Sequence, residues 1–103
     1  MSTSSIVYKI AARNEWEVAQ REGVYRGSKD DLRDGFIHLS TKSQVSTTLL
    51  RHFAGQHDLL LISFEASTLG EALRFEASRD GQQFPHLYGA LDPSLSIEIV
   101  ELA

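Results

Sequence analysis

The chain has 103 residues, of which 42% are hydrophobic and 23% charged, a composition typical of one globular domain and unlike that of a disordered or collagenous chain. It contains no cysteine, which excludes disulfide scaffolds, thiol nucleophiles and thiolate metal sites. Ten basic and fourteen acidic residues give a formal net charge of −4, without the basic surplus that usually drives nucleic-acid binding.

The sequence shows neither a membrane segment nor a secretion signal. No apolar run approaches the roughly 18–20 residues that cross a bilayer, and the longest, Leu59 to Ile62, is typical of a buried strand. The first residues lack a basic stretch ahead of an apolar one. We therefore expect a cytoplasmic protein without membrane or nucleic-acid partners. We expect a single domain over residues 1–103, with residues 1–5 disordered.

The N-terminal quarter is predicted to hold a strand followed by a helix. Residues 6–11 are mainly apolar and predict a first strand. Asn14, with Glu17 three residues later, has the spacing of a capping box and predicts the start of a helix. Gly23 is the expected C-cap of that helix.

The next segments predict a loop, a strand and a second helix. Residues 24–34 are polar and charged, so we expect a connection without regular structure. Residues 36–40 predict a short strand. Thr41 and Gln44 form a second capping box, which predicts a helix that ends at Gly55.

Strands are predicted to dominate the second half of the chain. We expect strands at 58–65, 73–78, 86–91 (entered through Pro85) and 96–102, with a helical turn at 67–72 and a tight turn at Asp80-Gly81. Two helices that do not alternate regularly with about six strands predict an α+β domain with a split, mainly antiparallel sheet.

Two strand segments carry titratable side chains within an apolar pattern. His38 and Ser40 share one strand face, and His86 and Tyr88 share a face in the same way. If the two faces meet, two imidazoles, a hydroxyl and a phenol converge, which suits binding of a polar ligand or acid–base chemistry near neutral pH. The alternative is that both histidines are structural groups with backbone partners.

Further candidates also have a functional and a structural interpretation. Glu76 is either a general base or ribose anchor, or an edge-strand carboxylate in a salt bridge. Lys9 is either an anion anchor or an edge-strand lysine that reaches the solvent. His38, His86 and Glu76 have the composition of a two-histidine, one-carboxylate metal site, but we expect no metal. His52 and His57 are expected to be structural or solvated.

Several segments in order resemble the DUF952 family, small bacterial proteins of unknown function. They are Val7 to Ile10, Trp16, Gly23 to Ser28, Asp34 to Thr41 with Gln44, Leu73 to Glu76 and Phe84 to Gly89. The pairing of GFIHLS with FPHLYG is the most specific part of this pattern. The family pattern is similar to the ADP-ribosyltransferase fold, in which a split sheet binds NAD in a cleft.

That resemblance implies NAD as cofactor and a role for each candidate residue. His38 and Ser40 would hold the nicotinamide ribose or amide, and His86 and Tyr88 would complete the cleft wall. The same resemblance places Tyr8 and Lys9 in the cleft. We further expect Arg26 and Glu76 to bind the cofactor, with Lys9 or Arg26 on the pyrophosphate. Two other functions stay open: a non-catalytic module that binds a small nucleotide-like ligand, and an interaction domain in which the histidines are structural.

Overall fold

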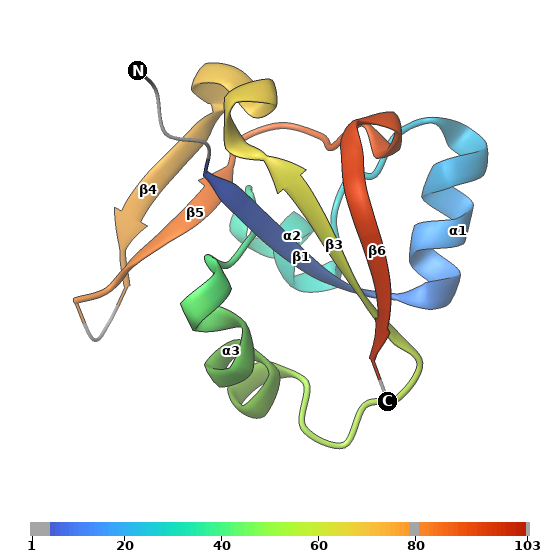
Figure 1. Cartoon of the computed structure of the whole chain (residues 1–103), viewed down its shortest axis with the longest axis horizontal. Helices are drawn as coiled ribbons and strands as arrows, with labels where there is room; N and C mark the ends of the chain where they lie inside the picture. Colours follow the sequence, from blue (N-terminus) through green and yellow to red (C-terminus); the bar gives the residue numbers. More distant parts are fainter. Residues whose placement is uncertain (1–4, 79–80, 103) are drawn as a thin grey trace.

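Six strands form two antiparallel sheets of three strands each, with three α-helices around them (Figure 1). The computed structural model describes residues 5–78 and 81–102. The strands are β1 (Ile6–Ala12), β2 (Ile37–His38), β3 (Leu59–Glu65), β4 (Leu73–Ala77), β5 (Gln83–Leu87) and β6 (Ser96–Leu102). The helices are α1 (Arg13–Glu22), α2 (Lys29–Asp34) and α3 (Val45–His52), with 3₁₀ turns at Lys42–Gln44, Ala66–Ala72 and Pro93–Leu95. The predicted α+β class with antiparallel sheets is confirmed.

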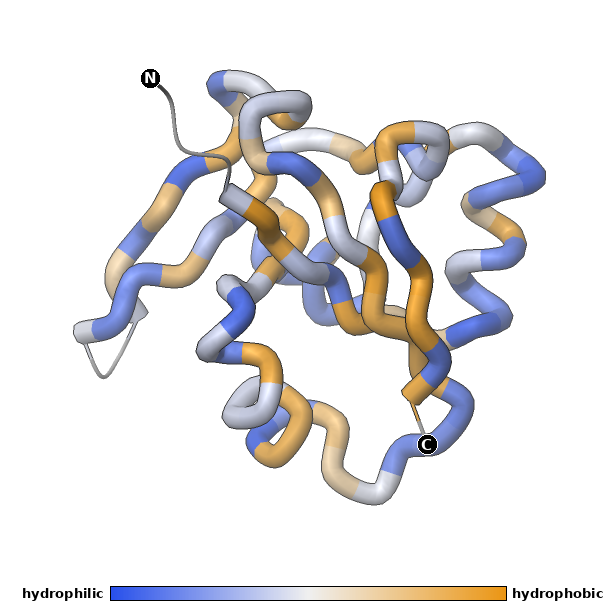
Figure 2. The backbone as a smooth tube through the Cα atoms, viewed as in Figure 1, coloured by the Kyte–Doolittle hydropathy of each residue, from blue (hydrophilic) through white to orange (hydrophobic). Residues whose placement is uncertain are grey.

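The first sheet has the order β1-β3-β6 and contributes Val7, Ala11, Leu60, Ile62 and Phe64 to the buried core. β1 and β3 pair over their whole length, from Ile6 opposite Glu65 to Ala12 opposite Leu59. Hydrophobic residues concentrate along β3 and β6, whereas α1 is largely hydrophilic (Figure 2). Ile62 and Phe64 in the middle strand are fully buried, because β3 has neighbours on both edges.

The second sheet has the order β2-β5-β4 and brings the two histidine segments together. His38 and His86 are direct cross-strand partners. The sheets meet where Tyr8 and Ser40 exchange backbone hydrogen bonds of 2.8 and 2.9 Å. The histidine pair therefore lies beside the first strand of the other sheet.

Helix α1 ends as expected but begins differently. Gly23 is its C-cap in the left-handed conformation, at φ 81°, which favours glycine. The predicted cap at Asn14 is wrong, because β1 continues directly into the helix and Ala12 occupies the N-cap position. The side chain of Asn14 instead accepts a hydrogen bond from the N–H of Glu15.

The expected loop at 24–34 contains a helix that the sequence analysis missed. Helix α2 begins after a capping box in which the side chain of Ser28 accepts the N–H of Asp31 and the side chain of Asp31 accepts the N–H of Ser28. The helix has six residues, only one of them apolar. Helical hydrophobic periodicity therefore cannot reveal it.

Two strand boundaries differ from the prediction. The second strand covers two residues rather than 36–40, although Ser40 keeps its bridge to Tyr8. β5 runs from Gln83 to Leu87 instead of 86–91. Pro85 lies inside β5, where its carbonyl oxygen accepts the N–H of Leu39 at 3.0 Å. A proline has no N–H to donate, but it can thus contribute to the hydrogen-bond ladder through its carbonyl oxygen.

The remaining expectations have mixed outcomes. The Thr41–Gln44 capping box is confirmed at the 3₁₀ turn that leads into α3, but α3 ends at His52 rather than at Gly55. Most of 1–5 and part of the Asp80-Gly81 turn lie outside the described residues. Among those described, no helix has the length and apolar character needed to cross a bilayer.

Candidate functional site

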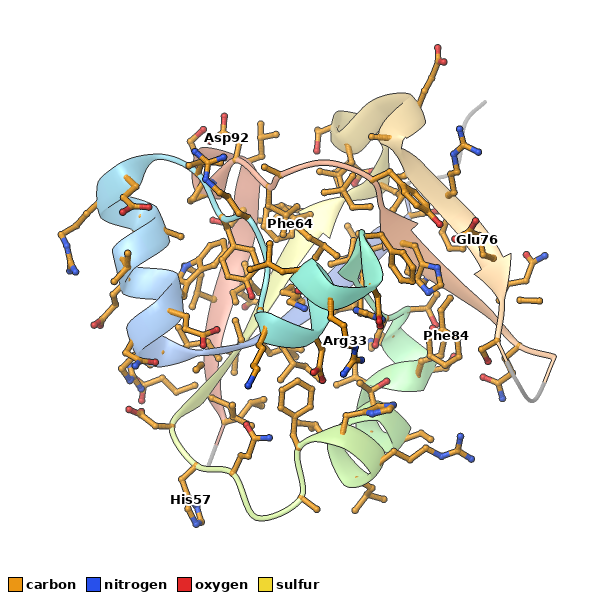
Figure 3. All side chains as sticks on the ribbon, turned by 180° about the vertical axis from the view of Figure 1, so that it is seen from behind. Arg33, His57, Phe64, Glu76, Phe84 and Asp92 are labelled. Carbon is orange, nitrogen blue, oxygen red and sulfur yellow. The ribbon has the colours of Figure 1, made fainter. Side chains whose placement is uncertain are left out.

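A groove of about 530 Å³ runs between β1, α2, α3 and the second sheet. Its walls include both strand histidines and basic side chains from the two helices: His38, His86, Arg33, Arg51 and His52. Arg33 on α2 and Phe84 on β5 both line the groove, and Figure 3 shows them from behind. The fold thus places titratable groups from five elements on one concave surface.

The two strand histidines lie side by side and share one aromatic neighbour. The centroids of the His38 and His86 rings are 5.7 Å apart. Phe36 stacks on His86 with a centroid distance of 4.1 Å and an interplanar angle of 26°, and its centroid is 4.6 Å from that of His38. The predicted convergence of the two histidine strands is therefore present.

Two carboxylates contact the His38 ring, one at each nitrogen. Nδ1 lies 2.6 Å from Oδ1 of Asp31, and Nε2 lies 3.0 Å from Oδ2 of Asp34. When both carboxylates are ionised, the ring can satisfy both contacts only as an imidazolium, because a neutral imidazole has a single N–H.

Lys9 and Asp31 form a buried ion pair behind His38. Their Nζ and Oδ2 atoms are 2.8 Å apart, and each residue is 3% exposed. Burial lowers the pKa of Lys9, although the charge and hydrogen bond of Asp31 oppose this. Burial would raise the pKa of Asp31, but the hydrogen bond with His38 and the charge of Lys9 outweigh it and hold that pKa well below its ordinary value. Lys9 therefore does not extend to the solvent as an edge-strand lysine would.

Glu76 on β4 contacts His86 on the neighbouring strand β5. Its Oε1 atom lies 2.7 Å from Nδ1 of His86 and accepts the hydroxyl of Tyr88 at 2.7 Å. Hydrogen bonds from His86 and Tyr88 lower the pKa of Glu76, and the bond to Glu76 raises the pKa of Tyr88. Figure 3 shows Glu76 on β4. His86 and Tyr88, which were predicted to share one strand face, therefore both contact the carboxylate of Glu76.

The other candidates divide between the groove and its surroundings. Tyr8, Lys9 and Ser40 line the groove, and the Ser40 hydroxyl lies 3.0 Å from that of Thr48. Arg26 is exposed and lines a separate pocket of about 220 Å³, which shares Phe36 with the groove. The structure thus does not place Arg26 with the other candidates.

The sequence analysis missed two carboxylates of the site, Asp31 and Asp34. A detectable signal was present, because Ser28 and Asp31 have capping-box spacing. A helix that starts there places Asp31 and Asp34 three residues apart, and so on one face. Both then contact His38.

The carboxylates of the site contact the ring nitrogens of the two histidines. Among residues 5–78 and 81–102, no group of three or more histidine and acidic side chains is arranged to hold a metal ion. In particular, the carboxylate of Glu76 contacts Nδ1 of His86. The His38 ring contacts different carboxylates, those of Asp31 and Asp34.

Comparison with known proteins gives the family. Residues 10–99 match the family model described as "Protein of unknown function (DUF952)". The chain belongs to the DUF952 family. This DUF952 chain is also 45% identical to protein CC0527 from Caulobacter crescentus, whose crystal structure matches it with a TM-score of 0.93 over 96% of this chain and 87% of that one.

The solution NMR structure of CC0527 agrees with this comparison. It matches the DUF952 chain with a TM-score of 0.83 at 46% identity, over 94% of this chain and 84% of that one. No curated protein matches the chain. The resemblance to DUF952 seen in the residues is confirmed.

Proposed function

We propose that this DUF952 chain binds a nucleotide-like ligand in the groove, with NAD as its cofactor, and acts as an ADP-ribosyltransferase-like enzyme. The observation that carries the proposal is the pair of carboxylate-supported histidines on the wall of a 530 Å³ groove. This volume lies within the range of about 300–1,000 Å³ typical of small-molecule sites. Paired imidazoles are suited to hydrogen bonding and proton transfer near neutral pH.

The charged side chains of the groove suit the phosphates of such a ligand. Lys9 is held in a buried pair with Asp31, and Arg26 lies outside the groove. Arg33 is exposed, and its contacts with Asp30 and Asp34 are surface ion pairs. We assign the pyrophosphate to the exposed basic side chains of the two bordering helices, Arg33, Arg51 and His52, since guanidinium groups bind phosphate oxygens bidentately.

Aromatic side chains supply surfaces for flat rings. Phe36 and Phe84 line the same groove, and such faces suit stacking of a nicotinamide or adenine ring. Bound NAD would supply a ribose carbon that bears a good leaving group. The histidines would orient the ribose through hydrogen bonds.

A second candidate function is ligand binding without turnover. It is favoured by the contacts that the predicted catalytic groups already make: the Ser40 hydroxyl with Thr48, and both His38 nitrogens with carboxylates. Such a module would bind ADP-ribose or NAD without releasing nicotinamide.

A thermal-shift titration with NAD, ADP-ribose and nicotinamide tests the binding proposal. Ligand at about 100 times its Kd should stabilise the native state by about 2.7 kcal/mol. We expect this stabilisation in the wild type and a large loss in His38→Ala, His86→Ala and Arg51→Glu. His57→Ala removes an exposed histidine outside the groove and should behave like the wild type.

The outcomes separate the candidate functions. Binding with release of free nicotinamide supports the enzyme, and binding without release supports the module. If none of the three ligands stabilises the wild type, both are refuted in favour of an interaction domain with structural histidines. Because Arg51 is on the exposed face of α3, its reversal tests the groove even where a histidine variant is unstable.

A further inference from the structure

The two histidines of the groove have different hydrogen-bonding partners. At His86, Nδ1 lies 2.7 Å from a carboxylate oxygen of Glu76. An ionised carboxylate only accepts hydrogen bonds, so Nδ1 must carry the proton. The hydroxyl of Tyr88 donates to the same oxygen and helps to keep Glu76 ionised.

This proton position leaves a lone pair on Nε2 of His86. Among the described residues, no hydrogen bond is made to that atom. The side chain is 14% exposed and lines the groove, and Phe36 covers one face of the ring. This nitrogen can therefore accept a hydrogen bond from an O–H or N–H group of a ligand in the groove.

His38 has the opposite arrangement. Carboxylate oxygens of Asp31 and Asp34 lie 2.6 Å from its Nδ1 and 3.0 Å from its Nε2, so both nitrogens already face a carboxylate. The pKa of each of these carboxyl groups is lowered, which supports their ionised state. His38 is therefore less suited than His86 to accept a proton from a ligand.

We infer that His86 is the proton acceptor of the groove, that Glu76 is its positioning residue, and that the acceptor substrate carries an O–H or N–H nucleophile, such as a hydroxyl group. This inference rests on the proposed function. Nε2 of His86 takes the hydroxyl proton while the hydroxyl oxygen forms a bond to the ribose carbon. At the same time the bond from that carbon to the nicotinamide nitrogen breaks, and its electron pair leaves with the nicotinamide.

Proton positions in the free protein test the first part of the inference. Two-bond ¹H–¹⁵N spectra at pH 7.5 should show His86 as the Nδ1–H tautomer. Glu76→Ala should leave His86 as a mixture of tautomers, whereas Glu76→Gln, which keeps an acceptor oxygen, should preserve Nδ1–H. Glu71→Ala removes an exposed carboxylate elsewhere and should change neither ring.

Nicotinamide release from NAD, with water as the hydroxyl acceptor, tests the catalytic part. His86→Gln should reduce the rate by about 10²–10⁴-fold, the usual contribution of a general base, without a comparable loss of ADP-ribose affinity. A proton on Nε2 of His86 or an unchanged rate in His86→Gln would overturn the inference. Failure of NAD and ADP-ribose to bind would instead refute the proposed function, because the tautomers are measured without ligand.

Discussion

Asp31 connects the elements that border one side of the groove. Its two oxygens accept from four donors: the Lys9 ammonium, the N–H of Ser28, and both the N–H and the ring of His38. A carboxylate offers about four acceptor sites, so all of them are used. One buried side chain thereby connects β1, α2 and β2.

Removal of Lys9, the buried cationic partner of Asp31, should destabilise the folded protein. Lys9→Met leaves Asp31 buried without its cation, and we expect the free energy of unfolding to fall by about 3–5 kcal/mol. The double variant Lys9→Met/Asp31→Asn removes both charges and should regain part of that loss. Urea denaturation measures both effects, with Lys42→Met on the exposed surface as the control. Equal losses in Lys9→Met and the control would contradict the assignment.

The same residue should make stability depend on pH in the acid range. The pKa of Asp31 is lowered in the folded protein, so the unfolded chain takes up its proton first, near its ordinary value of about 3.9. The contribution of Asp31 is complete above that pH and is lost as pH falls towards the folded pKa. Urea midpoints between pH 6 and 2 should therefore decline less steeply in Asp31→Asn than in the wild type. Parallel curves would show that Asp31 is not responsible.

At the scale of elements, α2 is the segment that assembles the site. It supplies Asp31 and Asp34 to His38 and lines the groove with Arg33. Its position relative to β1 depends on the turn before it, where Gly27 has φ +117° and approaches Asp31 closely.

Substitution of that glycine should disturb α2 and the site together. A Cβ atom at Gly27 would lie 2.6 Å from Cβ of Asp31, so Gly27→Ala must displace the helix as well as strain the backbone. Gly35→Ala provides the matched control, because its φ is +86° but no atom lies within 4 Å of the added Cβ. We expect a loss of about 1–2 kcal/mol for Gly35→Ala and a larger one for Gly27→Ala. Only Gly27→Ala should shift the NMR signals of the His38 ring; unchanged signals would contradict this coupling.

At the scale of the whole molecule, the two sheets share one core. Ile37, Leu39 and Leu87 from the histidine-bearing segments belong to the same buried cluster as Trp16 and Phe64. The strands that carry the site therefore also form part of the core, and we expect the site and the core to unfold together.

Unfolding of the site and of the core should coincide. The only tryptophan, Trp16, is 1% exposed and reports on the core by fluorescence, while the ring signals of His86 report on the second sheet. We expect the two probes to give the same urea midpoint, as in a two-state transition. An earlier midpoint for His86 would show that the second sheet unfolds independently.

Local features were predictable because their causes lie within a few residues. The glycine cap at Gly23, the capping box at Thr41 and the alternation that puts His38 and Ser40 on one strand face all follow from neighbouring side chains. The short polar helix α2 escaped detection because a capping box without apolar periodicity is a weak signal. The strand boundaries around Pro85 were misplaced because a proline was expected at the start of the strand, whereas Pro85 lies inside β5 and takes part in pairing through its carbonyl oxygen.

The family and the α+β class follow from residue order, local pattern and composition, all of which are visible in the chain. The partners of the site follow from long-range pairing: Lys9 meets Asp31 across 22 positions in the sequence, and the register of β2 against β5 sets His38 beside His86. Strand register depends on the packing of both sheets against one core. For that reason the sequence pattern identified the two histidines, and only the folded structure showed which carboxylates contact each of them.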